Sequence, residues 1–568
     1  MHGRIFPKSG TMANFGISKT DRLDKVDTLI VGSGLIGAVF ARTLVSAGKR
    51  VLMIDIGNQE TRKIGDHKKN SVAVQKDISL FTNSIKGELH TLSVPTSGAN
   101  NNTEPVSWNP TPGQACYLQN GQNPKQQAWD NLDAAAASRV VGGMGSHWTC
   151  CTPRQFPGME RCDLFTDEEW DQLYDRAEKM FWTNSTSFDH SIRQQLVKHV
   201  LQDAYSDRGR EILSMPLACK RSTKNKDFVE WACPASILGD LAEPKCNNEL
   251  FEIRPNTQCI KLIVDKFTGQ VELAQVKDLM EDKEYWIQAK KIVVCAGAVL
   301  TAGILHNSDG LAETLPALGH YMTDQTLAFC QVVLKKSLVD NVKNDPYHLG
   351  WKAIVERHQE KHPNDPLPFP FNDPDPQCYF PLTKEFPWHT QIHREAFGYG
   401  EVPAGTDQRV VVDFRWFGYV KPLKENYVEF SKDVTDEFGM PQPTFHYRID
   451  EEDSERIVRM ITDMVEAARN IGGFLPGAEP KYLPPGSALH ITGTYRAGRC
   501  AEAKDSVVDR TGRVWGQKNL VLGGCGVIPT QNACNPTLTA ACFALAAADQ
   551  LIKELDGVGH WKPRSSHT

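Results

Sequence analysis

Residues 26–57, VDTLIVGSGLIGAVFARTLVSAGKRVLMIDIG, decide the fold. The pattern predicts a strand, a glycine turn, a helix and a second strand, which is a βαβ unit. Gly32 makes the tight turn, Gly34 lets the backbone approach a pyrophosphate, and Gly37 lets the helix pack on the strand. Asp55 ends the second strand, where an acid would bond a ribose hydroxyl. We therefore expect a dinucleotide at the positive end of this helix, rather than a glycine turn in an unrelated α/β unit.

Length and composition restrict the function classes. A chain of 568 residues is expected to fold as two large domains. Its net charge of −6 mixes both signs without a basic stripe, so we expect no nucleic-acid partner. Apolar runs are shorter than the roughly 18 residues that span a bilayer, and residues 1–25 lack the apolar core of a secretory signal. We expect no membrane association, a flexible N-terminal extension and an intracellular, cytoplasmic protein.

The 15 cysteines form no Cys-x-x-Cys pair and no Cys/His cluster. We therefore expect no metal site, and buried free thiols rather than disulfides.

Later segments return to the same nucleotide fold. Residues 290–305, KKIVVCAGAVLTAGIL, resemble the late strand of flavoproteins of the glutathione-reductase type, which favours FAD over NAD. Residues 519–528 resemble the strand that closes that site. Residues 409–417 alternate with period two, as a strand does, and residues 454–470 have one apolar helical face formed by Ile457, Ile461, Met464, Val465 and Ala468.

The expected fold class is α/β. It combines a Rossmann-type FAD-binding domain, discontinuous in sequence, with an α+β substrate domain built on an antiparallel sheet. The FAD-binding domain is expected to take residues 26–185, 286–330 and 481–568. Residues 331–480 are expected to form the substrate domain with a small subdomain at about 340–385, and residues 186–285 to serve both. The polar stretch 58–135 is an extended excursion that could contact a second subunit.

A histidine and an asparagine form the candidate catalytic pair. His490 opens the segment HITGT, and Asn535 opens NPTLT before the last helix. An alcohol releases hydride readily only when its hydroxyl proton is taken up or shared, and a neutral imidazole can accept that proton. An amide can orient the hydroxyl without competing for the proton. These segments resemble the glucose–methanol–choline oxidoreductases, and the resemblance implies that both side chains lie beside the flavin ring.

A closer resemblance, over about residues 26–555, is to the pyranose oxidases of that group. It is carried by SHWTC at 146–150 and by PWHTQIHREAFGYGEVP at 387–403. It implies a covalent bond from His147 to the flavin 8-methyl carbon and places Thr149 near the ring. Further residues implied to contact FAD are Cys150, Ala296, Asn535 and Thr537. Those implied to recognise the sugar are Gln391, His393, Glu395, Phe397, Tyr399 and Arg415, with His490 and Asn535.

The resemblance implies oxidation of D-glucose and similar aldopyranoses at C2, with O2 reduced to hydrogen peroxide, by a homotetramer. Two departures stand out, because the family usually has Asp at Glu395 and His at Tyr495. Alternatives remain open: oxidation at C3 or of glycosides, a quinone-dependent dehydrogenase, an FAD-containing lyase, and a sugar-binding protein without activity. The alternative for His147 and His490 is a structural histidine, and for His393 and Glu395 it is an ordinary surface loop.

Overall fold

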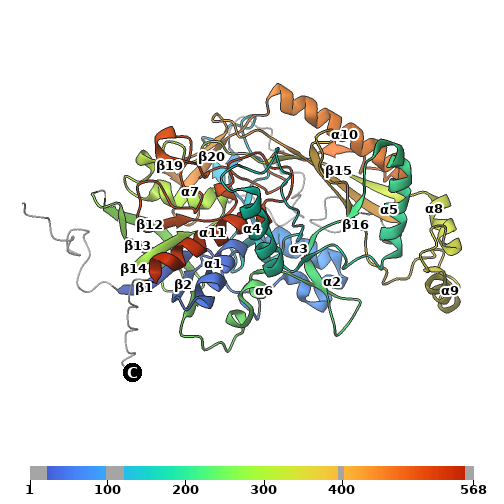
Figure 1. The fold of residues 1–568 in the computed structure, drawn as a ribbon, viewed down its shortest axis with the longest axis horizontal. Coiled ribbons are helices and arrows are strands. Elements are labelled where there is room, and N and C mark those ends of the chain that lie inside the picture. Colours follow the sequence, from blue (N-terminus) through green and yellow to red (C-terminus); the bar gives the residue numbers. More distant parts are fainter. Residues whose placement is uncertain (1–21, 97–120, 266, 394–401, 404, 557–568) are drawn as a thin grey trace, which may run out of the picture.

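The chain forms two seven-stranded sheets with helices packed against each (Figure 1). The structure is a computed structural model, and it describes residues 22–556 except 97–120, 266, 394–401 and 404. Glu395, Phe397 and Tyr399 therefore lie outside the described residues.

The first sheet is the dinucleotide-binding sheet. Its strand order is β11-β2-β1-β14-β13-β12, with β23 also paired to β14. The strands are β1 (Leu23–Val31), β2 (Val51–Ile54), β11 (Phe251–Arg254), β12 (Thr257–Asp265), β13 (Gln270–Asp278), β14 (Lys283–Val294) and β23 (Leu520–Leu522). β1 lies parallel to both β2 and β14, and β23 lies parallel to the end of β14. Segments from both ends of the chain therefore build one sheet, as predicted.

Helices cover this sheet, and two of them, α1 (Leu35–Ser46) and α11 (Thr537–Leu555), are apolar on most sides. These two helices pack against each other, and they share one core with β1, β2 and β14. α4 (Asp167–Phe181) packs on α11, and α6 (Pro234–Leu238) packs on α1 (Figure 1). α7 (Ala298–Asn307) follows β14 and contacts β12.

The second sheet is antiparallel. Its strands run β21-β15-β18-β17-β16-β8, and β22 pairs with β15. They are β8 (Leu213–Ser214), β15 (Gln325–Leu334), β16 (Gln377–Tyr379), β17 (Trp388–His393), β18 (Val411–Tyr419), β21 (Gly472–Phe474) and β22 (Lys481–Tyr482). α10 (Glu451–Ile471) and α5 (Ile192–Tyr205) lie along it, while α8 (Lys336–Asn341) and α9 (Lys352–Lys361) project far from β1 (Figure 1).

A hairpin of β19 (Tyr427–Thr435) and β20 (Pro441–His446) contacts α7. Parts of the 58–135 stretch are also attached to this hairpin. Asn123 Nδ2 donates to Pro443 O at 3.1 Å, and Phe445 N donates to Gln126 Oε1 at 2.8 Å.

The expected starts of two strands were wrong. β1 begins at Leu23, inside the segment predicted to be a flexible extension, because it pairs with β14 from there. β18 begins at Val411, because Arg409 and Val410 belong to a 3₁₀ turn in which Asp407 accepts from Arg409 N at 2.9 Å.

On α10, the predicted Ile461 and Val465 are only half-buried. Met460 and Ala467 are fully buried instead, because the face toward the sheet is centred one residue earlier.

The described residues contain no helix that is both long and apolar enough to cross a membrane. Nor do they contain a group of three or more His, Cys, Asp or Glu side chains suited to a metal ion. All fourteen described cysteines are free, and most are buried, as predicted.

Candidate active site

A long cavity connects the glycine turn after β1 with His490. Its wall is formed by the β1–α1 and β14–α7 turns, the start of β12, the β19–β20 hairpin and the start of α11. Its lining residues include Gly32, Gly34, Asp55, Ser138, Arg139, Ala296, Gly297, Phe438, His490, Pro536 and Thr537. Predicted cofactor and catalytic residues from distant parts of the chain therefore border one space.

The three glycines of the turn have different reasons to lack a side chain. A Cβ on Gly37 would lie 2.0 Å from Gly32 O, and one on Gly32 would lie 2.5 Å from Cys295 O. Gly32 also has φ +102°, in the left-handed region. A Cβ on Gly34 would have Gly142 O, at 3.9 Å, as its nearest neighbour. Packing within the protein thus explains Gly32 and Gly37, whereas Gly34 leaves open space toward the cavity.

Asp55 borders the same end of the cavity and organises the turn. Its carboxylate accepts from Ser33 Oγ at 2.6 Å, Ser33 N at 2.8 Å and Gly57 N at 2.7 Å. Gly142 N in turn donates to Ser33 Oγ at 2.8 Å, which ties in the loop before His147. Burial raises the pKa of Asp55. The carboxylate has acceptor positions left for a ribose hydroxyl.

Two long helices begin at the cavity without a side-chain cap. α1 starts after Gly34 and α11 after Pro536, and neither N-cap residue makes a side-chain hydrogen bond. The free N–H groups and the helix dipole favour negative charge at both places. Thr537 and Ala296 are in the cavity wall, as the prediction of cofactor contacts requires.

His490 and Asn535 meet at the other end of the cavity. Asn535 Nδ2 lies 3.1 Å from His490 Nε2, and Gln325 Oε1 lies 2.7 Å from His490 Nδ1. Gln391 Nε2 donates to Asn535 Oδ1 at 2.8 Å. The amide of Asn535 is thereby oriented with its N–H groups toward the histidine. The predicted pair is therefore assembled, and a predicted sugar-binding residue is bonded to it.

Burial sets the protonation state of this pair. Desolvation lowers the pKa of His490 to about 3, so the imidazole is neutral at neutral pH and one ring nitrogen keeps its lone pair. Asp324 accepts from His490 N at 3.1 Å, and burial raises the pKa of Asp324 to about 7.

Two further sugar-binding candidates lie on adjacent strands. Arg415 is opposite Gln391 in the β17–β18 register, and both are buried. His393 is buried on β17, and burial with the nearby Arg415 lowers its pKa well below the usual range. His389, which the sequence analysis did not select, lies 3.3 Å from Gln391 Nε2 through its own Nε2.

Of the residues around the expected flavin link, His147 is hydrogen-bonded to the cavity wall. His147 is buried, its Nε2 lies 3.0 Å from Ser138 Oγ, and Ser138 is in the cavity wall. Its Nδ1 is buried without a hydrogen-bond partner among the described residues. Thr149 is half-buried, and Cys150 is fully buried with φ +62° and its Sγ 3.5 Å from Ala232 O. His147, Thr149 and Cys150 are not in the lining of this cavity.

The sequence analysis missed the groups that hold the pair in place. Gln325 Nε2 donates to Asn532 O and to Cys534 O, both at 2.8 Å. Glu160 accepts from Ala533 N at 2.6 Å and Cys534 N at 3.1 Å, which holds the loop before α11. Neither Gln325 nor Glu160 belongs to a motif, so nothing in the local sequence signals them.

Tyr495, the other departure from the family pattern, is buried beside the cavity wall. Its hydroxyl donates to Gly523 O at 3.0 Å and lies 3.5 Å from Gly297 O. It therefore supports two glycine turns that border the cavity.

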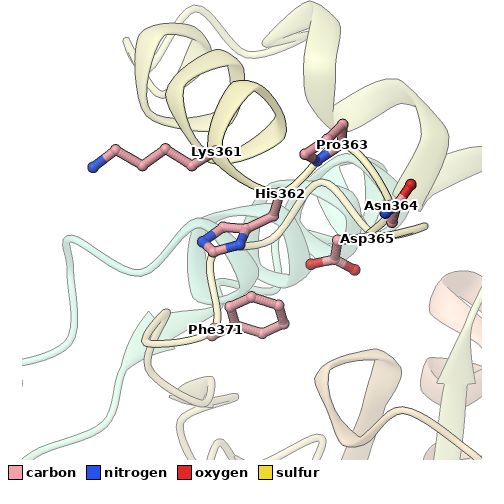
Figure 2. A pocket seen from close by; sticks show the side chains of 6 residues that line it. All are labelled: Lys361, His362, Pro363, Asn364, Asp365 and Phe371. Carbon is pink, nitrogen blue, oxygen red and sulfur yellow. The ribbon is translucent and has the colours of Figure 1, made fainter.

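A second hollow lies on the small projection after α9. It is lined by Lys361, His362, Pro363, Asn364, Asp365 and Phe371 (Figure 2). Figure 2 shows the rings of His362 and Phe371 close together, with Lys361 pointing away. Asp365 is bonded to His358 Nε2 at 2.8 Å and to Arg409 Nη1 at 2.7 Å. These contacts give Asp365 a structural role, and none of the predicted site residues lines this hollow.

The sequence is similar to known oxidoreductase families. Residues 422–544 match the GMC oxidoreductase family model. Pyranose 2-oxidase of Lyophyllum shimeji is 40% identical, over 99% of this chain and 98% of the relative. C-glycoside 3-oxidase of Arthrobacter globiformis is 29% identical, over 93% of this chain and 95% of the relative.

Among solved structures, formate oxidase superposes with a TM-score of 0.62 at 12% identity, over 95% of this chain and 100% of that one. This likeness confirms the predicted fold class, and the sequence identity to Lyophyllum shimeji pyranose 2-oxidase identifies the family. The chain belongs to the pyranose 2-oxidase family of GMC oxidoreductases.

Proposed function

We propose that this chain is an FAD-dependent sugar oxidase that converts D-glucose and other aldopyranoses to 2-keto sugars and reduces O2 to hydrogen peroxide. Family membership supports the reaction class. The observation that carries the proposal is the pairing of His490 Nε2 with Asn535 Nδ2, at 3.1 Å. His490 borders a cavity that begins at a dinucleotide turn, and Asn535 directly precedes Pro536 and Thr537 in the wall of the same cavity.

The residues around the cavity fit FAD. Gly34 leaves room for a pyrophosphate against the free N–H groups of α1, and Asp55 can accept from a ribose hydroxyl. The start of α11 can hold the polar edge of a flavin through its dipole and Thr537. When bound, FAD accepts the hydride from the carbinol carbon and passes the two electrons to O2.

The side chains at the far end of the cavity supply the proton chemistry. His490 Nε2 accepts the hydroxyl proton as the C–H bond gives up its hydride, so the alcohol becomes a ketone. Asn535 Nδ2 donates to the same hydroxyl oxygen and aligns it. Gln391 Oε1 offers an acceptor, and the Arg415 guanidinium offers donors, to the remaining sugar hydroxyls. His490 then carries a proton, and its positive charge favours negative charge developing on oxygen.

We extend the proposal to a covalent bond between His147 and the flavin 8-methyl carbon. His147 Nε2 is hydrogen-bonded to Ser138, which lines the cavity. Its ring is neutral at neutral pH, because burial lowers the pKa of His147 to about 3, so a nitrogen lone pair is available for the bond. Forming the bond would remove one hydrogen from the methyl group and one proton from the imidazole, and the two electrons released would pass to O2.

The oligomeric state is proposed from the family alone. We propose a homotetramer, which light scattering on the purified protein tests.

Oxidation at C3, or of a glycoside, is the second candidate for the reaction, because a C-glycoside 3-oxidase is a more distant relative. A quinone could also replace O2 as the electron acceptor.

Product analysis separates these candidates. The protein is incubated with D-glucose in air with catalase, and the product is examined by ¹³C NMR after labelling at C2 or at C3. A ketone signal from the C2 label supports the proposal, and one from the C3 label favours the second candidate. Peroxide measured without catalase, with benzoquinone as the competing acceptor, identifies the oxidant.

A further inference from the structure

We infer that Gln325 is a positioning residue: it holds His490 in the tautomer that can act as a base, and it holds Asn535 in register with it. This inference rests on the proposed function. It concerns a residue of β15, which is far in sequence from both members of the pair.

The orientation of the Gln325 amide is dictated by its surroundings. The side chain is buried, and its Nε2 donates to Asn532 O and Cys534 O, both at 2.8 Å. A flipped amide would place an oxygen against two carbonyl oxygens and lose both bonds. Gln325 Oε1 therefore faces His490 Nδ1, at 2.7 Å.

This orientation fixes the proton on the imidazole. A carbonyl oxygen only accepts, so His490 Nδ1 must carry the hydrogen. The lone pair then lies on Nε2, which faces the Asn535 amide, and His490 itself borders the cavity. The other tautomer would leave Nδ1 and Oε1 as two acceptors in contact, and it would turn an N–H toward the substrate hydroxyl instead of a lone pair.

The same amide aligns the second member of the pair. The loop 532–535 presents Asn535, and Gln325 is bonded to two of its carbonyls. The loop has other attachments, because Glu160 holds Ala533 N and Cys534 N, and Gln155 Nε2 donates to Asn532 Oδ1 at 2.7 Å. A change at Gln325 should therefore shift the pair without unfolding the loop.

The Gln325 side chain is uncharged, and this affects the protonation of His490. A carboxylate in place of the amide would attract a proton to His490 and make it a poor acceptor near neutral pH. The titratable groups that face His490 are Asp324, at its backbone, and His389 from β17, whose own low pKa results from burial and from His490. A neutral acceptor at Nδ1 keeps the base uncharged despite Asp324.

The test compares three variants by anaerobic stopped-flow reduction of the bound flavin with D-glucose, from pH 5 to 9. Gln325→Met removes the acceptor at similar volume. Gln325→Glu keeps an acceptor and adds charge. Gln331→Met is the matched control, since Gln331 is buried on the same strand and its Nε2 donates to Asp413 at 3.0 Å, away from His490.

Gln325→Met should slow flavin reduction by about 10²-fold or more, which is the lower end of what a positioned base contributes. Its dissociation constant for glucose, taken from the saturation of the same rates, should change less than threefold. Gln325→Glu should recover part of the rate at high pH and lose it toward pH 5, because the added carboxylate raises the pKa of His490, whereas the parent, whose His490 pKa is about 3, should show no acidic limb in this range. Flavin content and the Gln331→Met profile should match the parent.

Gln325→Met reducing flavin at the parental rate, or Gln325→Glu keeping the parental pH profile, would overturn the inference. Equal slowing by Gln331→Met would do the same, because it would mean general damage to β15. Failure of the unchanged protein to be reduced by any sugar would instead overturn the proposed function.

Discussion

Replacing Gly34 and Gly37 by alanine should have opposite consequences, because only one of them faces the cavity. In Gly37→Ala the new Cβ would lie 2.0 Å from Gly32 O, about 1 Å closer than a carbon and a carbonyl oxygen approach, so the turn must open. Overpacking of this kind costs about 3 kcal/mol, and the better helix propensity of alanine returns about 1 kcal/mol. We expect the apoprotein to lose about 2 kcal/mol of unfolding free energy.

Gly34→Ala should leave the apoprotein almost unchanged. Gly34 has φ −59° and ψ −177°, which alanine adopts freely, and its nearest neighbour would be 3.9 Å away. The methyl group would instead meet the bound pyrophosphate. A similar overpacking cost of about 1–3 kcal/mol then falls on binding, which weakens FAD affinity by roughly tenfold to 10²-fold.

The assay uses the His147→Ala background, so that a covalent bond cannot retain the flavin. Apoprotein is prepared by acid ammonium sulfate treatment and titrated with FAD by quenching of flavin fluorescence, and its thermal unfolding is recorded separately. Parental FAD affinity in Gly34→Ala, or parental apoprotein stability in Gly37→Ala, would refute the division of roles between these glycines.

Three other variants test separate parts of the site. His147→Ala should release all yellow colour to the supernatant on acid precipitation, whereas the parent keeps it in the pellet; colour in both supernatants would contradict the covalent bond. His490→Ala should lower the rate of flavin reduction by about 10²- to 10⁴-fold in stopped flow with flavin content unchanged, and a smaller loss would assign the base elsewhere. Asp324→Asn removes a carboxyl whose pKa is about 7 in the folded protein and about 4 when unfolded. The stability that its protonated form provides is complete below pH 4 and is lost as pH rises through 7, so the variant should gain stability relative to the parent between pH 5 and pH 8 in thermal melts. A difference in melting temperature between variant and parent that stays constant from pH 5 to pH 8 would argue that Asp324 is already ionised at pH 5.

Local patterns predicted much of the fold because they act over short distances. The βαβ unit at residues 26–57 needs only its apolar runs and three glycines, and the structure confirms it. The helix predicted at 454–470 is present, but its start moves to Glu451 because Asp450 accepts from Asp453 N at 2.7 Å. Its buried face also differs, since the sheet beneath it decides which side is covered.

Some residues of the candidate site could be predicted from the sequence and others could not. His490 and Asn535 belong to motifs with fixed surroundings, and they meet as expected. Gln325 could not be found in the same way, because its role depends on three segments that meet only in the folded chain. The loop that carries Glu395 lies outside the described residues, so its part in sugar recognition stays a prediction.

The central claim is that the cavity holds a flavin that a sugar reduces with His490 as the base. The most direct measurement adds D-glucose anaerobically to the purified yellow protein and follows the flavin absorbance near 450 nm. The account predicts bleaching, followed by recovery of the colour and release of peroxide when air is admitted, with His490→Ala bleaching far more slowly. Flavin that stays oxidised with glucose and with every other sugar and glycoside tested would contradict it.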